Sequence, residues 1–433
     1  MDTRVSSVES RHDQVGRAGP DTSRGGAVQK IMRSIGAATS VCFRVVFPDG
    51  ASYQNHERAP DVTVLFRNRR ALRRVVMFGH VGFLEGYFEG DVDIEGNLAL
   101  AIRAGMDAGF DRAPGLLVRI RNWWHEFRFS NASIEQARDN ACFHYSLGRD
   151  FYKHWLDEYG LMYTCAWWKE GTKTLEEAQK NKMDLVCRKV LLKPGETFAD
   201  IGSGFGGLLF HAHEHYGALG TGINASDIQV KETREEIKKR GLEGKVEVLQ
   251  GKIECLERDF RQPPRQFDKL LSIGTLEHAG RDQMMEVIQA HADFMKPGAL
   301  GVIHFIGHVG VRPTEFWIRR YIFPGGWIPS LAQAIDCCEK AGLEVVDVEN
   351  LRRNYALTLD AWAERFDRNW DKIRALDPNK FDERFRRIWR TYLWGCAEMF
   401  RSPNGRTHLF QIVVSKGNLT ATNYPMSRKF LYE

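Results

Sequence analysis

Apolar runs of strand length alternate with amphipathic stretches of helix length in the second half of the chain. After a turn and strand that lead into a glycine-rich loop at 200–207, strands are predicted at residues 219–223, 245–250, 267–273 and 299–306. Residues 207–216 predict one helix, and Ser226 and Gly241 fit the N-cap and the C-terminal glycine of another. Strands that alternate with helices predict an α/β domain with a doubly wound, mostly parallel sheet.

The first part of the chain has another pattern, in which short apolar runs alternate with basic clusters. We expect a disordered arm at 1–26, a smaller N-terminal accessory domain at 27–130, the α/β domain at 131–415 and a polar tail at 416–433. Ser133 and Gln136 have the spacing of a helix capping box near the start of the larger domain.

The accessory region contains a dense basic cluster. Its five arginines crowd into eight residues: Arg67, Arg69, Arg70, Arg73 and Arg74. Two interpretations are open, a solvated face or a patch that meets lipid phosphates.

The segment at 114–129 combines an apolar stripe with basic residues. The stripe repeats at helical spacing through Leu116, Leu117, Ile120, Trp124 and Phe127, with arginines between its members. Such a stripe packs on a core in most proteins, but tryptophan beside arginine is also typical of helices that lie at a membrane surface. Both interpretations stay open at this point.

Composition narrows the class of protein. A hydrophobic content of 43% and a charged content of 27% are typical of a soluble globular chain, and no uncharged apolar stretch is long enough to span a bilayer. The eight cysteines form no C-x-x-C pair, so we expect no metal site, and their scatter fits a reducing cytoplasm. The net charge of +5 does not require nucleic acid and suits an anionic membrane surface.

The glycine loop reads Asp200, Ile201, Gly202, Ser203, Gly204, Phe205, Gly206 and Gly207. It satisfies the dinucleotide fingerprint, so a nicotinamide cofactor is the obvious alternative. Two residues argue against that cofactor. Asp200 places a carboxylate where dinucleotide folds carry an apolar residue, and Asn224 ends the next strand where an NAD site needs an acid. The loop therefore predicts S-adenosylmethionine.

Several segments, in this order, resemble the cyclopropane-fatty-acid synthase and mycolic-acid methyltransferase family: FHYSLGRDFYKHWLD, LMYTCAWW, FADIGSGFGG, LSIGTLEHAG, GVIHFIG, YIFPGGWIPS, NYALTLDAWAERF and YLWGCAEMF. The resemblance covers about residues 140–415 and implies a Rossmann-like class I methyltransferase with a seven-stranded sheet. It implies these S-adenosylmethionine contacts: Tyr163, Thr164, Asp200, Ile201, Gly202, Ser203, Gly204, Phe205, Gly206, Asn224, Ser226, Gln229, Gly251 and Lys252. Lys252 departs from the family, which usually has an aromatic there, and Ser203 stands where most relatives have cysteine.

The resemblance also implies a bicarbonate ion as proton acceptor. The residues that match its ligands are Cys165, Glu277, His304, Ile306 (through its backbone) and Tyr355. Cys396 matches a position once proposed as a nucleophile, and buried packing is the alternative role for it. Carbocation chemistry calls for a dry pocket with aromatic walls. The candidates for those walls are Phe305, Trp317, Tyr321, Phe323, Trp327, Trp362 and Phe366.

The implied reaction converts the cis double bond of an unsaturated phospholipid acyl chain to a cyclopropane. A sibling reaction that leaves a methyl or methylene branch starts from the same cation, and a non-catalytic lipid-binding protein is the alternative from another class. We expect a homodimer in the cytoplasm, peripherally bound to the inner face of the cytoplasmic membrane.

Overall fold

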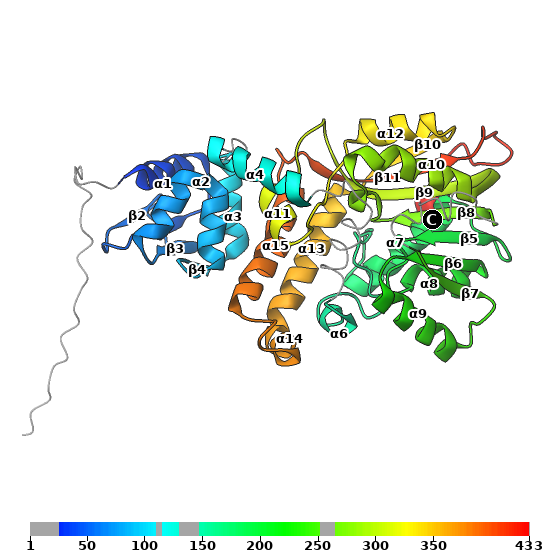
Figure 1. The fold of residues 1–433 in the computed structure, drawn as a ribbon, viewed down its shortest axis with the longest axis horizontal. Coiled ribbons are helices and arrows are strands. Elements are labelled where there is room, and N and C mark those ends of the chain that lie inside the picture. Colours follow the sequence, from blue (N-terminus) through cyan, green and yellow to red (C-terminus); the bar gives the residue numbers. More distant parts are fainter. Residues whose placement is uncertain (1–25, 110–114, 130–146, 252–264, 433) are drawn as a thin grey trace, which may run out of the picture.

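The computed structural model describes residues 26–109, 115–129, 147–251 and 265–432. The arm predicted at 1–26 falls outside these ranges except for Gly26, and the capping box predicted at Ser133 falls outside them entirely. The described chain forms a smaller N-terminal unit (26–109 and 115–129) and a larger unit (147–251 and 265–432), each built on its own sheet (Figure 1).

The larger unit contains a seven-stranded sheet in the order β10-β11-β9-β8-β5-β6-β7. Its parallel strands are β5 (Thr197–Ile201), β6 (Leu219–Asn224), β7 (Val246–Gln250), β8 (Phe267–Ile273) and β9 (Met295–His308). The strand β11 (Thr407–Ser415) inserts antiparallel between β9 and β10 (Glu344–Asn350). The predicted α/β fold class with a mostly parallel sheet is confirmed.

Helices cover both faces of this sheet. On one face α7 (Leu175–Lys189), α8 (Gly207–Tyr216) and α9 (Asp227–Arg240) pack in one apolar cluster; on the other, α10 (Met284–Phe294) and α12 (Leu331–Lys340) pack in a second. The caps of α9 are as predicted. The Ser226 side chain accepts a hydrogen bond from the backbone N–H of Gln229, and Gly241 ends the helix at φ 64°.

The N-terminal unit has a four-stranded sheet in the order β2-β1-β3-β4. Its strands are β1 (Phe43–Val46), β2 (Ser52–Gln54), β3 (Val62–Phe66) and β4 (Val92–Gly96), and its helices are α1 (Ala27–Ala38), α2 (Arg69–Phe88), α3 (Leu98–Asp107) and α4 (Leu116–Phe129). Helix α2 is kinked at Gly79, whose φ of 54° and ψ of −133° suit glycine alone.

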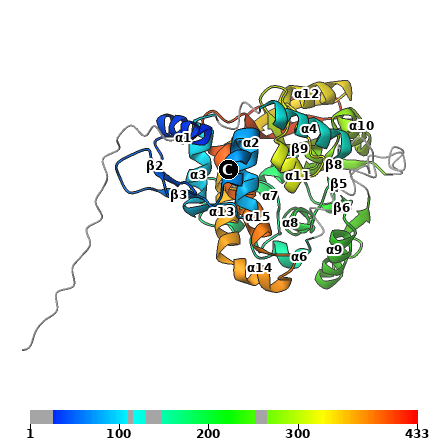
Figure 2. The same cartoon turned by 60° about the vertical axis from the view of Figure 1, so that its left-hand side comes forward.

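The two units share one core. Between the sheets lie α11 (Phe316–Tyr321), α13 (Arg352–Arg368), α14 (Trp370–Leu376) and α15 (Glu383–Arg401) (Figures 1 and 2). One buried apolar cluster runs from the N-terminal strands into these helices. Two ion pairs cross the same boundary, Arg103 with Glu398 and Asp93 with Arg387. A hydrogen bond also crosses it: the hydroxyl of Tyr321 in α11 donates to Glu85, which forms an ion pair with Arg121 of α4. The boundary is thus packed by apolar contacts and pinned by buried carboxylates.

The basic cluster is only partly available to a ligand. Arg67 pairs with Asp93, and Arg70 and Arg74 pair with Asp91. Arg69 and Arg73 are exposed. Three arginines of the cluster are therefore paired with aspartates, and Arg69 and Arg73 are the members left for a ligand.

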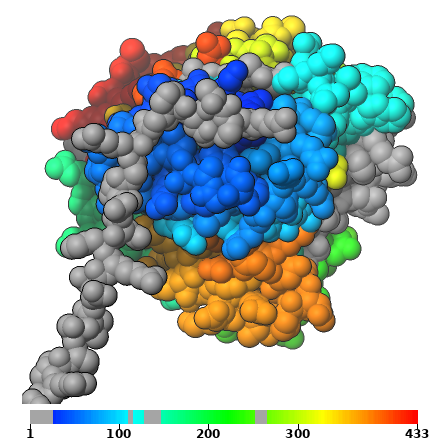
Figure 3. All heavy atoms as spheres, turned by 90° about the vertical axis from the view of Figure 1, so that its left-hand side faces the viewer, coloured from blue at the N-terminus to red at the C-terminus, as the bar shows by residue number. Residues whose placement is uncertain are grey.

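The apolar stripe of α4 faces solvent. All five of its predicted members are between 46% and 75% exposed, and Trp123 is 62% exposed, whereas Val118 and His125 are buried among the side chains of α4 that the structure describes. Core packing of the stripe is therefore the wrong interpretation. The inward face of α4 uses Arg121, which lies over Phe78 and Phe316, so the apolar stripe is left outside. Figure 3 shows the atoms of α4, in cyan, at the surface beside the blue atoms of the N-terminal unit. Within the described stretches, no helix is long and apolar enough to cross a bilayer.

Candidate active site

A cavity of about 1360 Å³ opens at the carboxyl ends of β5, β6, β8 and β9. Every predicted site residue lines it except Gly206, Gly251 and Lys252. Gly206 is the N-cap of α8, Gly251 follows β7 and donates to the carbonyl of Asn224, and Lys252 lies outside the described residues. The fold thus collects one site from segments spread over more than two hundred residues of chain, as open α/β sheets do.

The glycine loop has the shape of a cofactor cradle. Gly202 has a φ of 78°, and a β-carbon there would lie 2.4 Å from Cγ2 of Thr275, so only glycine fits. The Asn224 amide donates to the carbonyl of Gly204 (2.9 Å) and to Oε1 of Gln229 (3.0 Å). Asn224 therefore holds the loop against the start of α9 while lining the cavity.

Two buried ionisable side chains, Asp200 and Lys182, influence each other near this loop. Burial raises the pKa of Asp200 to about 7, and the nearby Lys182 opposes that rise. Burial lowers the pKa of Lys182 to about 8, and its Nζ donates to Oγ1 of Thr164 at 3.0 Å. Asp200 thus presents a carboxylate to the cavity in a place where water is scarce, which strengthens its attraction for a cation.

The segment that carries Tyr163, Thr164 and Cys165 is held by buried polar residues. Asp157 accepts from the backbone N–H groups of Gly160 (2.6 Å) and Met162 (2.8 Å). Gln179 donates to the carbonyl of Thr164 at 2.8 Å. The sequence analysis missed Asp157, Gln179 and Lys182. Their signal was present, because Gln179 and Lys182 lie among apolar residues on the buried face of α7.

Glu277 is the acid of the site. It sits in a one-turn 3₁₀ helix, η1 (Leu276–His278), directly after β8. Its Oε1 accepts from the backbone N–H of Ile306 at 2.6 Å, and its buried Oε2 has no partner among the described residues. Burial raises the pKa of Glu277 to about 7. The free oxygen is therefore a strong hydrogen-bond acceptor for a ligand.

A buried relay orients His304. Gln411, opposite His304 in the β9–β11 pair, donates through Nε2 to Nδ1 of His304 at 3.0 Å. Its Oε1 accepts from Nζ of Lys189 at 2.6 Å, and Lys189 also donates to Glu349 at 2.5 Å. Because an ammonium only donates, the oxygen of Gln411 must face Lys189 and its NH₂ must face His304.

The relay fixes where the imidazole proton is. With Nδ1 accepting, the proton of neutral His304 lies on Nε2, a buried donor with no partner among the described residues. Burial lowers the pKa of His304 well below its usual value, and Lys182 and Lys189 lower it further. His304 is therefore a neutral residue of the cavity wall whose buried Nε2–H is available as a donor.

The remaining predicted residues form the walls around this position. Burial raises the pKa of Tyr355 well above its usual value and the pKa of the Cys396 thiol to about 12. Burial also raises the pKa of the Cys165 thiol, whose Sγ donates to the carbonyl of Ala166. All three side chains stay protonated at neutral pH, so Cys396 has the environment of a packing residue and not of a thiolate nucleophile.

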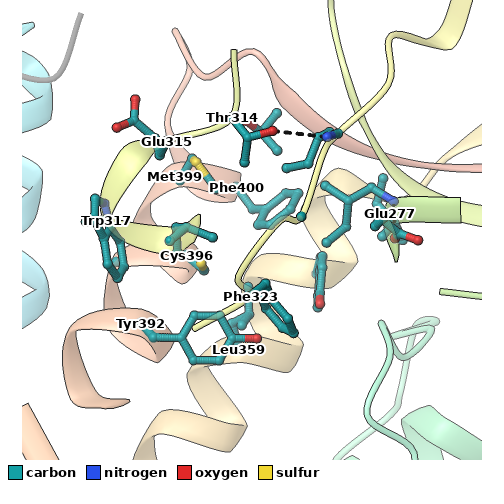
Figure 4. A pocket seen from close by; sticks show the side chains of 18 of the residues that line it. Glu277, Thr314, Glu315, Trp317, Phe323, Leu359, Tyr392, Cys396, Met399 and Phe400 are labelled. Carbon is teal, nitrogen blue, oxygen red and sulfur yellow. Dashed lines mark hydrogen bonds between the residues drawn. The ribbon is translucent and has the colours of Figure 1, made fainter. Parts of the chain in front are cut away.

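Aromatic side chains line the cavity, although not all the predicted ones. Trp317, Phe323 and Trp327 reach it, while Phe305, Tyr321, Trp362 and Phe366 pack elsewhere. The sequence analysis missed Tyr392 and Phe400, which also line the cavity. Figure 4 shows Glu277 across the cavity from Trp317 and Cys396. The walls around Glu277 are therefore largely apolar and aromatic.

Comparison with known proteins decides the family. The family described as mycolic acid cyclopropane synthetase matches residues 132–412.

The chain belongs to the mycolic acid cyclopropane synthetase family.

Relatives within and around this family are similar over most of the chain. A probable fatty acid methyltransferase of Pseudomonas putida is 35% identical over 365 residues, covering 83% of this chain and 88% of that protein. The cyclopropane-fatty-acyl-phospholipid synthase of Escherichia coli K12 is 31% identical over 361 residues, covering 81% and 87%. The mycolic acid cyclopropane synthase CmaA1 in complex with SAH and CTAB is 29% identical, with a TM-score of 0.58, covering 64% of this chain and 98% of that one.

Family membership confirms the class of enzyme. The chain is an S-adenosylmethionine-dependent methyltransferase of a family that modifies lipids, with the class I methyltransferase fold expected from the sequence. The residues that line the cavity from the glycine loop, Asp200 among them, share it with Glu277, His304 and Ile306.

The relay makes a testable claim about His304. In the wild type, the imidazole nitrogen shifts should report a neutral ring protonated at Nε2. A carboxylate cannot donate, so Gln411→Glu should place a proton on Nδ1, raise the pKa of His304 and lower kcat by about 10- to 100-fold. Nitrogen-15 NMR on labelled histidine and steady-state kinetics measure both effects. Gln333→Glu is the matched control, because Gln333 closes a capping box that glutamate also closes. A wild-type ring protonated at Nδ1 would refute the assignment.

Proposed function

We propose that this enzyme transfers a methylene group from S-adenosylmethionine to the cis double bond of an unsaturated phospholipid acyl chain and so forms a cyclopropane. The observation that carries the proposal is the cavity itself. One continuous, largely apolar space joins the Asp200 loop to Glu277, His304 and Tyr355. A double bond held there would lie between a methyl donor and a proton acceptor, away from water.

The chemistry explains why the cavity is dry. The π electrons of the alkene form a bond to the sulfonium methyl carbon as the sulfur–carbon bond breaks, which leaves S-adenosylhomocysteine and a carbocation. Loss of a proton from the new methyl group closes the ring. Water would trap the cation, and the apolar walls exclude it. The rings of Trp317, Phe323 and Tyr392 offer their faces to positive charge at the same time.

The residues fit a bicarbonate ion. The buried Nε2–H of His304 and the Tyr355 hydroxyl are donors for its charged oxygens, and the unpartnered Oε2 of Glu277 is an acceptor for its hydroxyl group. A bound bicarbonate supplies the acceptor for the methyl proton. Glu277 holds the hydroxyl end and makes the ion more basic, while Ile306 fixes Glu277 through its backbone N–H.

A branched product is the second candidate. The same cation can end as a methylene branch by losing another proton, or as a methyl branch if a reductant delivers hydride. The 35% identity to the probable fatty acid methyltransferase of Pseudomonas putida supports this candidate. Both outcomes use the same residues.

We further propose that α4 holds the enzyme at an anionic membrane. The exposed stripe of α4 offers apolar and tryptophan surface, and Trp123 of the same helix also lines the cavity. Arg69 and Arg73 are exposed cations of the neighbouring helix α2, which also carries the exposed Arg70, paired with Asp91. A lipid drawn in past α4 would reach the cavity directly. The cytoplasmic location and the homodimer stay predictions from the sequence.

The function is tested by expressing the chain in a host that lacks cyclopropane lipids and analysing its phospholipid acyl chains. Mass spectrometry should detect the addition of one CH₂ unit to monounsaturated chains, and NMR should find cyclopropane protons. The signals of a methylene or methyl branch in place of the ring would establish the second candidate. No modified lipid of any kind would contradict both.

Glu277 gives a sharper mechanistic test. Glu277→Gln should lower kcat by at least about 100-fold, because an amide cannot hold the hydroxyl of the ion as a carboxylate does. Calorimetry should find S-adenosylmethionine binding within about twofold of wild type, since the cofactor contacts lie on other segments. Glu235→Gln, an exposed position on α9, is the control. Weakened cofactor binding with unchanged kcat would refute the role of Glu277.

The membrane role of α4 is tested with vesicles. Replacing both Trp124 and Phe127 with alanine should weaken binding to phosphatidylglycerol-containing vesicles by about tenfold or more, as expected from losing two large apolar side chains. Thermal unfolding should be unchanged, because both side chains are exposed. The exposed pair Leu357→Ala and Leu376→Ala is the matched control. Equal vesicle binding by both double variants would rule α4 out.

A further inference from the structure

The cavity does not end in the methyltransferase unit. It continues into the interior of the N-terminal unit, where its walls come from α1, β1, β3 and α3: Met32, Ile35, Phe43, Val62, Val64 and Gly105. These residues come from two helices and from two strands of the N-terminal sheet, a part of the chain that the family match at 132–412 does not include. The N-terminal unit thus encloses part of the same space as the reacting groups.

The junction between the two parts is built by both units. Ile102 of α3, Gly395 of α15 and Trp317 of α11 all line the cavity there. A β-carbon on Gly395 would lie 3.7 Å from Cδ1 of Ile102 and 3.8 Å from the Trp317 ring. Gly395, Ile102 and Trp317 therefore lie close together in the wall of the cavity, where α3 of the N-terminal unit meets α11 and α15.

The elements that line the cavity contribute side chains of different chemistry. The arm inside the N-terminal unit is apolar, and none of its wall residues from α1, β1, β3 or α3 is charged. Another side of the cavity carries His80, Arg119, Arg312 and Arg406, with Glu315 among them. A long ligand with one polar and one apolar end matches this division.

The size of the cavity agrees with two ligands. At about 1360 Å³ it exceeds the ~300–1,000 Å³ of sites for one drug-sized ligand. A cofactor bound at the glycine loop would fill one part of this space. A second, elongated and mostly apolar ligand is needed to fill the remainder.

We infer that the apolar arm binds the methyl-terminal end of the acyl chain whose double bond reacts. The inference rests on the proposed acyl-chain substrate and adds a binding site in the N-terminal unit. The N-terminal unit then selects acyl chains by their length beyond the double bond, in addition to any contact that it makes with the membrane. The polar side of the cavity takes the head-group end of the same lipid.

Gly105 allows a direct test. It lies inside α3 with an ordinary helical φ, and open space surrounds the place where its β-carbon would be. Gly105→Leu should therefore fold and should fill the arm. Ala101→Phe, one helical turn earlier on the same face, is an independent plug. Ala332→Leu, an exposed position on α12 away from the cavity, is the matched control.

The substrates are phosphatidylglycerols with a myristoleoyl or an oleoyl chain, which share the bond position and differ in the tail beyond it. Each plug should lower kcat/KM for the oleoyl lipid by about tenfold or more and for the myristoleoyl lipid by about twofold or less. An equal loss for both lipids, or a loss that follows the length of the saturated second chain, would overturn the inference. The control should match wild type.

A binding measurement separates this inference from the proposed function. Calorimetry with oleoyl and myristoleoyl lysophospholipids, in the presence of S-adenosylhomocysteine, should detect the same selective loss in Gly105→Leu. If the wild type modifies neither lipid while this selective loss persists, the proposed function fails and the acyl site stands. If binding of the two lysolipids is unaffected by both plugs, the acyl site fails whatever the turnover.

Discussion

The site depends on one buried cation, Lys189. Its ammonium is fully buried and needs acceptors, which Glu349 and Gln411 provide. Satisfying Lys189 orients the amide of Gln411, and the amide in turn sets the tautomer of His304. A charge that lies outside the cavity thus decides that the imidazole inside it is a donor. The antiparallel strand β11 is what makes this possible, because it carries Gln411 between α7 and β9.

The ionisable groups of the site are buried where water is scarce. Asp200 and Glu277 both have a pKa raised to about 7 by burial, and His304 and Lys182 are shifted towards their neutral forms. The same apolar packing that shifts these groups would protect a carbocation. The electrostatics of the site and its tolerance of a reactive intermediate therefore have one physical origin.

The local sequence pattern predicted the helices and strands whose ends depend on hydrophobic periodicity and on capping residues. Strand β8 and helix α8 fall at the predicted residues because period and capping specify them. The candidates for binding the cofactor and the base were identified from the family resemblance, and most of them line one cavity. What the sequence could not give was pairing across distance. The contact of Gln411 with His304 depends on the register of β11 against β9, and nothing local encodes that register.

The other misjudged features have similar causes. Helix α4 has a clear apolar stripe, yet its inward face is the one that carries Val118, Arg121 and His125, since Arg121 pairs with the buried Glu85. Tertiary pairing overrode amphipathicity there. The aromatic candidates Trp362 and Phe366 pack in the core because α13 turns them away from the cavity. The extension of the cavity into the N-terminal unit has no sequence signature, because a hollow is defined by side chains from several elements at once.

We propose that the base of this enzyme is a bound bicarbonate ion that Glu277, His304 and Tyr355 hold. The most direct measurement is turnover of an unsaturated phospholipid in buffer stripped of carbon dioxide and bicarbonate, followed by titration of bicarbonate at constant pH and ionic strength. We predict that the stripped enzyme loses most of its turnover and that bicarbonate restores it in a saturable manner. Full turnover in the stripped buffer, with no response to added bicarbonate, would show that bicarbonate is not the base.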